Sequence, residues 1–225
     1  MDDNSPACIF IYENAVLSQV TLNQNEIIAC GGEEPTSPNA DFGGIFINKC
    51  EKVSFSDNTF SGNTGKKSGA GYLEAGRIYF TDNFILENRN NYTGNENYAG
   101  AFTLKTAERF SAEGDVINFN ISAKSGGALY LEATGTEPVD LFLSYIYMEG
   151  NNASNEGGAI LVNSVLDTLN IDNSEIYSNY SSAGSGGFIS LISAGFNSLI
   201  VERNSMLDNF VSENSYGGFL FLRHN

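Results

Sequence analysis

A pair of small residues followed by apolar residues recurs along most of the chain. The segment Glu156–Val162, EGGAILV, is one copy, and the second residue of the pair falls at positions 44, 71, 100, 127, 158, 187 and 218, so that successive copies are 27 to 31 residues apart. A phosphate-binding loop would also need a basic or hydroxyl partner and a following helix. No Lys or Arg follows Gly158 before Arg203. The regular step instead indicates a structural repeat.

A second marker accompanies the later copies: a large apolar residue followed three positions on by Asn, as in Phe60-Ser-Gly-Asn63. The asparagines of this marker are Asn63, Asn88, Asn120, Asn151, Asn179 and Asn209, and others precede them at Asn58, Asn83, Asn173 and Asn204. An unpaired buried amide costs about 1–3 kcal/mol. We therefore expect these side chains to form ladders, each amide bonded to the Asn one repeat away.

Apolar residues alternate over short runs between Gly, Asn and Ser, as in Leu169-Asn-Ile171 and Ile78-Tyr-Phe80, which is typical of strands. Units this short bury a core only by stacking on one another. The sequence predicts an all-β fold, a right-handed parallel β-helix (a β-solenoid of pectin-lyase-like architecture) with about seven coils of 27–31 residues. We expect residues 1–42 to form an irregular N-terminal coil with an exposed loop, and the repeats of residues 43–225 to continue beyond the C-terminus, because no polar cap follows them.

The glycine pair marks a tight corner of each predicted coil. Its first residue can need a positive φ, and its second can lie against the backbone of the neighbouring coil, which excludes a side chain. Ala70 and Ala99 stand in place of the first glycine, so smallness matters there. The glycines to which we assign this structural role are Gly43, Gly44, Gly71, Gly100, Gly126, Gly127, Gly157, Gly158, Gly186, Gly187, Gly217 and Gly218.

Composition limits the partners of the chain. With 27 acidic and 11 basic residues, its net charge of −16 disfavours nucleic acid and anionic lipid. No apolar run is long enough for direct membrane insertion by this segment. The only His is His224 and no Cys/His set suggests zinc, so we predict no metal and no cofactor. A Cys8–Cys30 bridge would fasten the first coil, but three cysteines leave the pairing open.

Four glycosylation sequons occur, at Asn91, Asn120, Asn152 and Asn179. Asn120 and Asn179 belong to the predicted ladder and should be inaccessible. Asn91 and Asn152 are therefore the plausible sites.

Two aspartates, Asp57 and Asp82, align on neighbouring coils, as the carboxylates of a β-helical hydrolase would. Each directly precedes a ladder Asn at a turn, where Asp is common, so we predict no catalytic residue. With Asp115 they could instead bind Ca²⁺, although solvated turn residues are the favoured interpretation.

Better candidates for a binding surface are outward-facing tyrosines. They are Tyr72, Tyr79, Tyr130, Tyr145, Tyr147, Tyr177 and Tyr180. We expect specificity to lie in the loop from Asn88 to Tyr98 and in the 31-residue units.

The motifs Gly157-Gly158-Ala159-Ile160 and Phe60-Ser-Gly-Asn63 resemble the GGA(I/L/V) and FxxN repeats of the polymorphic membrane proteins of chlamydiae and of similar protist proteins. The resemblance implies an extracellular or cell-surface, non-enzymatic protein used in adhesion or recognition, with a protein or glycan ligand. Two alternatives stay open. One is a structural rod that contacts the subunits of a larger assembly, and the other is a pectin-lyase-like carbohydrate-active enzyme.

Overall fold

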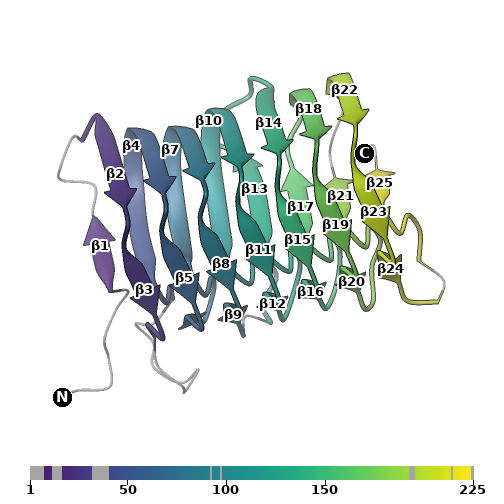
Figure 1. Ribbon diagram of the computed structural model, residues 1–225, viewed down its shortest axis with the longest axis horizontal. Coiled ribbons are helices and arrows are strands. Elements are labelled where there is room, and N and C mark those ends of the chain that lie inside the picture. Colours follow the sequence, from purple (N-terminus) through teal and green to yellow (C-terminus); the bar gives the residue numbers. More distant parts are fainter. Residues whose placement is uncertain are drawn as a thin grey trace.

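The structure, a computed structural model, describes residues 8–11, 17–31, 41–91, 93–96, 98–192, 196–213 and 215–223. These residues form an all-β parallel solenoid of about six turns and contain no helix (Figure 1). The predicted fold class is confirmed. The number of turns is smaller than the predicted seven coils, because the last copy of the repeat contributes only β25 (Leu220–Arg223) to its coil. The irregular loop predicted near residues 32–40 lies outside the described residues.

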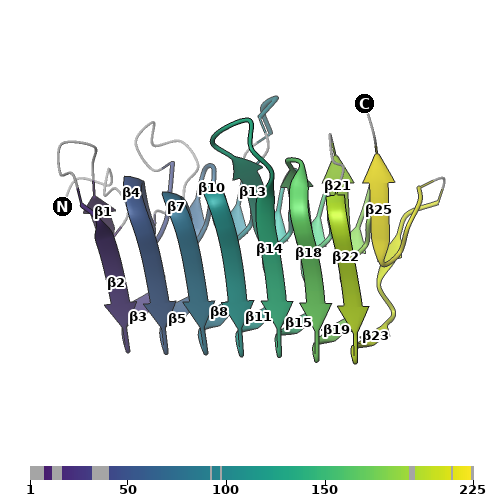
Figure 2. The ribbon, with the colours of Figure 1, turned by 90° about the horizontal axis from the view of Figure 1, so that it is seen from above.

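The largest of the three sheets, here the first sheet, has 12 strands among the described residues. Its main path runs β1 (Ile9–Ile11), β4 (Ile45–Ser56), β7 (Gly71–Thr81), β10 (Phe102–Glu113), β13 (Leu129–Ala133), β17 (Ile160–Asn163), β21 (Ile189–Ile192) and β25. Strand β2 (Gln19–Asn23) pairs with β4, and the later coils add β14 (Val139–Ser144), β18 (Leu166–Asp172) and β22 (Phe196–Glu202). Figure 2 shows these strands side by side along the rod.

The second and third sheets are built from much shorter strands. The second sheet contains β3 (Glu26–Ile28), β5 (Thr59–Ser61), β8 (Phe84–Leu86), β11 (Val116–Asn118), β15 (Tyr147–Glu149), β19 (Glu175–Tyr177) and β23 (Ser205–Leu207). The third contains β6 (Thr64–Gly65), β9 (Arg89–Asn90), β12 (Ile121–Ser122), β16 (Asn152–Ala153), β20 (Tyr180–Ser181) and β24 (Phe210–Val211). All strand pairings are parallel, so equivalent residues of successive coils lie next to one another.

Inward side chains of all coils share one apolar core. In the N-terminal half of the core, three phenylalanines pack around Phe80. The ring centroid of Phe80 lies 5.4 Å from those of Phe55 and Phe110, and 5.2 Å from that of Phe102. Phe102 also contacts Phe60, at 5.0 Å. The register places Gly71 between Ile45 and Phe102, and a Cβ added at Gly71 would overlap the carbonyl of Ile45.

The glycine corners follow the prediction in the later coils and depart from it in the first ones. Gly126, Gly157, Gly186 and Gly217 have φ between 65° and 74°. A Cβ added at Gly127, Gly158 or Gly187 would overlap the carbonyl of the stacked glycine on the next coil, as at Gly158 with the carbonyl of Gly187. The stacked row consists of Gly43, Gly69, Gly100, Gly127, Gly158, Gly187 and Gly218.

Gly44, Gly71 and Ala70 were therefore misaligned in the sequence prediction. The backbone nitrogen of Gly44 donates to the carbonyl of Gly69, and that of Ala70 donates to Ala101, so Gly44 and Ala70 do not occupy the positions assigned to them. Gly71 lies inside β7, one residue beyond Ala70. None of Gly43, Gly44, Gly69 and Gly71 has a positive φ, so these corners lack the turn that marks the glycine pair in the later coils.

Two ladders of polar side chains run along the coils, as predicted. In the second ladder, from Asn88 onward, each Asn Oδ1 accepts hydrogen bonds from both the backbone and the side-chain nitrogen of the preceding member. For the bonds from Asn88 to Asn120 these distances are 3.0 Å. The Nδ2 atoms also donate to backbone carbonyls, as Asn120 does to Ile85. The members are Cys30, Asn63, Asn88, Asn120, Asn151, Asn179 and Asn209.

The first ladder is less regular. It begins with Asn25, Asn58, Asn83 and Asp115, and resumes with Ser174 and Asn204 after Ile146. The assignment of Asn173 to this ladder was wrong. Asn173 has a positive φ of 48° and bonds to Asp172, while Ser174 takes the ladder position. The residue before each ladder member turns the chain, so a one-residue shift exchanges the two roles.

Cys8 and Cys30 form a disulfide with a Cα–Cα distance of 5.9 Å, which resolves the pairing that the sequence left open. Because Cys30 is the first member of the second ladder, the bond ties Cys8 to the first described turn of the second sheet. Cys50 is a free, half-buried thiol whose pKa is raised by burial.

A candidate ligand pocket on the first sheet

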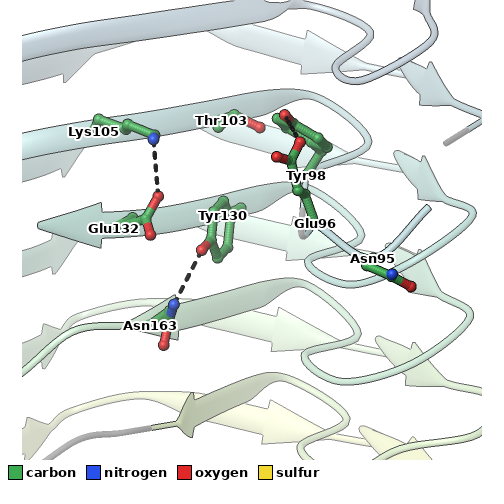
Figure 3. Close-up of a pocket in the computed structure, with 8 residues that line it drawn as sticks. All are labelled: Asn95, Glu96, Tyr98, Thr103, Lys105, Tyr130, Glu132 and Asn163. Atoms are coloured by element: carbon green, nitrogen blue, oxygen red, sulfur yellow. Dashed lines mark hydrogen bonds and ion pairs between the residues drawn. The ribbon is translucent and has the colours of Figure 1, made fainter. Parts of the chain in front are cut away.

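A pocket of about 330 Å³ lies on the outer face of the first sheet (Figure 3). Its floor comes from three successive coils: Thr103 and Lys105 of β10, Tyr130 and Glu132 of β13, and Asn163 of β17. Residues two apart on a strand share a face, so alternation points these side chains away from the core. The loop before β10 adds Asn95, Glu96 and Tyr98 as a wall.

Parallel register brings the floor residues together. Thr103 lies beside Tyr130, and Lys105, Glu132 and Asn163 follow one another across β10, β13 and β17. The Lys105 Nζ is 3.1 Å from Glu132 Oε2, and Asn163 Nδ2 donates to the Tyr130 hydroxyl at 3.3 Å. One network of polar groups therefore spans three coils.

The loop that forms the wall is anchored at several points. Lys124 Nζ donates to the carbonyl of Gly94. The Ser122 hydroxyl donates to the carbonyl of Tyr98 at 3.1 Å, and the Tyr98 hydroxyl donates to Glu96 Oε2 at 2.5 Å. At the base of the loop, the Ala99 nitrogen donates to Thr103 Oγ1 at 3.2 Å. These bonds hold the pocket open in a defined shape before any ligand arrives.

Tyr130 is nearly buried, with 4 % of its surface exposed. Burial, and to a smaller extent the negative charge of Glu132, raise the pKa of its phenol to about 12. The phenol is therefore protonated at neutral pH and serves as a hydrogen-bond donor. With amides, carboxylates and an ammonium group nearby, the pocket offers both donors and acceptors.

The remaining predicted tyrosines do not form one surface. Tyr72 stacks on Phe46 at 5.4 Å, on the coil before Thr103. Tyr79 lies under the Lys52 ammonium group, 5.2 Å from its ring centroid, on the distal half of β7. The others are dispersed: Tyr145 is 61 % exposed at a turn, Tyr147 and Tyr177 lie on the second sheet, and Tyr180 lies on the third. These tyrosines are dispersed because the three sheets face different directions. The spacing of the tyrosines along the sequence did not show on which sheet each one lies.

Of the three aspartates considered for catalysis or Ca²⁺ binding, Asp57 and Asp82 align on neighbouring coils as predicted, but Asp115 does not join them. Asp57 and Asp82 each have a φ of 54° and are exposed at the turn before the first ladder. The equivalent position of the next coil is Gly114, while Asp115 is buried in the ladder itself. Among the described residues, no group of three His, Cys, Asp or Glu side chains could hold a metal ion.

Asp115 is the most unusual carboxyl group of the fold. Its Oδ1 accepts two hydrogen bonds from Asn83 at 2.8 Å, but its Oδ2 is buried without a partner among the described residues. Burial raises the pKa of Asp115 to about 7, although the bonds from Asn83 oppose the rise. At neutral pH a carboxyl group that is only partly ionised therefore stands where the preceding coil has the amide of Asn83.

The sequence prediction found part of this pocket. It named Tyr130 and the loop from Asn88 to Tyr98, but missed Thr103, Lys105, Glu132 and Asn163. A usable signal was present: outward side chains occupy the third and fifth positions after the stacked glycine, as Tyr130 and Glu132 do after Gly127. Comparing these positions between coils would have grouped the floor residues.

No protein-family model matches the sequence, and comparisons with curated proteins and with solved structures found no match. The β-solenoid with asparagine ladders is thus established from the chain's own geometry. Among the described residues there is no helix with the length and apolarity to cross a membrane.

Proposed function

We propose that this protein is a non-enzymatic recognition module of a cell-surface or secreted protein, acting in adhesion, and that the pocket contacts its ligand. The observation that carries the proposal is the pocket itself: outward side chains from three coils, under an anchored loop, on a rod whose core does not depend on them. Rigid scaffolds that display variable outer residues are common recognition devices.

Two further observations support an extracellular setting. The Cys8–Cys30 disulfide is a bond that persists mainly in oxidising compartments. The motifs Gly157-Gly158-Ala159-Ile160 and Phe60-Ser-Gly-Asn63 resemble those of the polymorphic membrane proteins, whose β-helical parts serve in adhesion. On this proposal the ligand is a protein or glycan on a host or neighbouring surface.

The test is binding of the purified, fluorescently labelled chain to intact cells and to arrays of extracellular proteins and glycans. We expect saturable binding that falls at least about tenfold in a Glu132→Gln, Asn163→Ala double variant, which changes only pocket side chains. Asp57→Asn is the matched control, because it alters an exposed carboxylate outside the pocket. Binding to none of these targets would contradict the proposal. Turnover of acidic polysaccharides, assayed in parallel, would contradict the prediction that the protein is not an enzyme.

The last described coil favours a second candidate function, a rod that joins a larger assembly through a coil end. Large apolar side chains are exposed there: Leu207 by 60 %, Phe210 by 50 % and Leu222 by 48 %. Sedimentation of the purified chain tests this candidate. A monomer at about 100 μM, with no partner retained on native purification, would contradict it.

A further inference from the structure

We propose that the pocket binds one neutral pyranose ring of a glycan. The inference rests on the proposed recognition function and names the ligand class of the same pocket. It follows from three properties of the described lining residues: size, polar groups and charge.

The size of the pocket fits a small ring. Its volume of about 330 Å³ lies at the lower end of the range of about 300–1,000 Å³ in which proteins hold small molecules. Thr103 is small and lies in register beside Tyr130, and both residues belong to the floor. Tyr98 adds a second aromatic side chain at the wall. An aromatic face packs well against the C–H groups of a sugar ring, while the phenol hydroxyl bonds to the rim of that ring.

The polar lining fits a polyol. A sugar hydroxyl both donates and accepts, so it is best matched by groups of both kinds. Asn95 and Asn163 each supply an amide with a donor and an acceptor. In both carboxylates Oε2 is already engaged, in Glu96 by the Tyr98 hydroxyl and in Glu132 by Lys105. These bonds fix the orientation of each carboxylate, whose second oxygen can accept from a ligand hydroxyl.

The charge of the pocket disfavours an anionic sugar. The pocket lining contains two carboxylates, Glu96 and Glu132, but only one ammonium group, that of Lys105. This ammonium group is already paired with Glu132. Glu74 of the preceding coil, in register with Lys105, adds a further negative charge. Like charges about 4 Å apart near a protein surface repel by about 1–4 kcal/mol. A carboxylated sugar would therefore bind at least about tenfold more weakly than its neutral counterpart.

The experiment measures binding of methyl glycosides to the whole chain by calorimetry and saturation-transfer NMR. The probes are the neutral methyl glycosides of glucose, galactose, mannose and N-acetylglucosamine, the anionic methyl glucuronide and the cationic methyl glucosaminide. We expect a dissociation constant of about 1 mM for at least one neutral glycoside, as is ordinary for a single small ring. The methyl glucuronide should bind at least about tenfold more weakly.

The variants localise the site. Tyr130→Ala should weaken binding at least about tenfold. Because Tyr130 is nearly buried and its loss could disturb the sheet, Glu132→Gln provides a second variant that keeps the side-chain shape. Tyr79→Ala removes a tyrosine from the same sheet outside the pocket, so it should leave the affinity unchanged.

Three outcomes would overturn the inference: no neutral glycoside binding at about 20 mM, binding only of the charged glycosides, or binding that neither Tyr130→Ala nor Glu132→Gln weakens. Cell binding by the same protein separates these failures from failure of the proposed function. If cell binding persists and depends on the pocket variants while sugars fail to bind, only the sugar assignment is wrong. If cell binding also fails, the recognition function is wrong.

Discussion

Replacing Asp115 by Asn should stabilise the protein, most strongly above neutral pH. Asp115 occupies an amide position of the first ladder, and its Oδ2 is buried without a partner among the described residues. An Asn there would place an Nδ2 donor at this position, where Asn83 one coil earlier donates to the carbonyl of Phe55 at 3.0 Å. The substitution therefore supplies a missing hydrogen bond and removes a group that cannot be ionised cheaply.

The magnitude follows from the shifted pKa of Asp115. Burial raises this pKa from 3.8 to about 7, which corresponds to roughly 4 kcal/mol between the protonated and ionised forms. The folded state retains a proton that the unfolded state has lost, so the free energy of unfolding decreases as the pH rises from about 4 to about 7. The contribution of Asp115 to the free energy of unfolding is fully present below the pKa of the unfolded state, and it is lost as the pH rises through the pKa of the folded state. The nearby negative charge of Asp82 acts in the same direction.

The assay is urea unfolding of the wild-type protein and the Asp115→Asn variant at pH 4, 6 and 8. At pH 4 we expect the variant to gain about 1 kcal/mol from the added hydrogen bond. At pH 8 the gain should be larger by an amount on the order of 1–4 kcal/mol, because the wild type then loses the stability linked to its shifted pKa. Asn88→Asp is the matched control: it introduces the same carboxyl group into the complete second ladder and should destabilise the protein more at pH 8 than at pH 4. A pH-independent difference between Asp115→Asn and wild type, or a loss of stability at pH 8, would refute the reasoning.

Three other substitutions or modifications test the packing rules. Gly158→Ala should lower the free energy of unfolding by more than about 2 kcal/mol, because the added Cβ would overlap the neighbouring backbone. The control Gly135→Ala places its Cβ near no other atom, so its stability should be within about 0.5 kcal/mol of wild type. Equal effects of the two substitutions in thermal melts would contradict the stacking role of Gly158. Phe102→Ala should cost about 3–5 kcal/mol in urea unfolding, because the fully buried ring packs against those of Phe55, Phe60 and Phe80. When the chain is secreted from a eukaryotic host, peptide mass spectrometry should find glycan on exposed Asn91 and none on fully buried Asn120; a modified Asn120 would contradict the ladder.

The fold was predictable because its determinants repeat. Each coil reuses one residue pattern, so a row such as Asn63, Asn88 and Asn120 is visible as a regular spacing in the sequence alone. Register within the corners was harder: Gly71 was aligned with the stacked glycines although it lies inside β7, because coil length varies by several residues and a glycine looks the same in both places. The position of Asp115 in the first ladder was likewise missed, because Asp and Asn are both common at turns.

The pocket was less predictable because its residues are not part of the repeating pattern. Inward positions are constrained by the coils above and below, which keeps them apolar and similar from coil to coil. Outward positions such as Thr103, Tyr130 and Leu161 lie in one row but have no common size or polarity. What groups them is parallel register, a property of three dimensions, together with a loop that folds back over the sheet and is fixed by Lys124.

This separation of inward and outward residues has a consequence for function. Exchanging Glu132 or Asn163 alters no core contact and no ladder bond, so ligand preference can change while the rod keeps its stability. The loop is different, because its bonds to Ser122 and Lys124 come from the coil that follows it. Replacing Lys124 should therefore weaken ligand binding through the shape of the wall, although Lys124 does not line the pocket. A solenoid built in this way can vary its specificity one coil at a time.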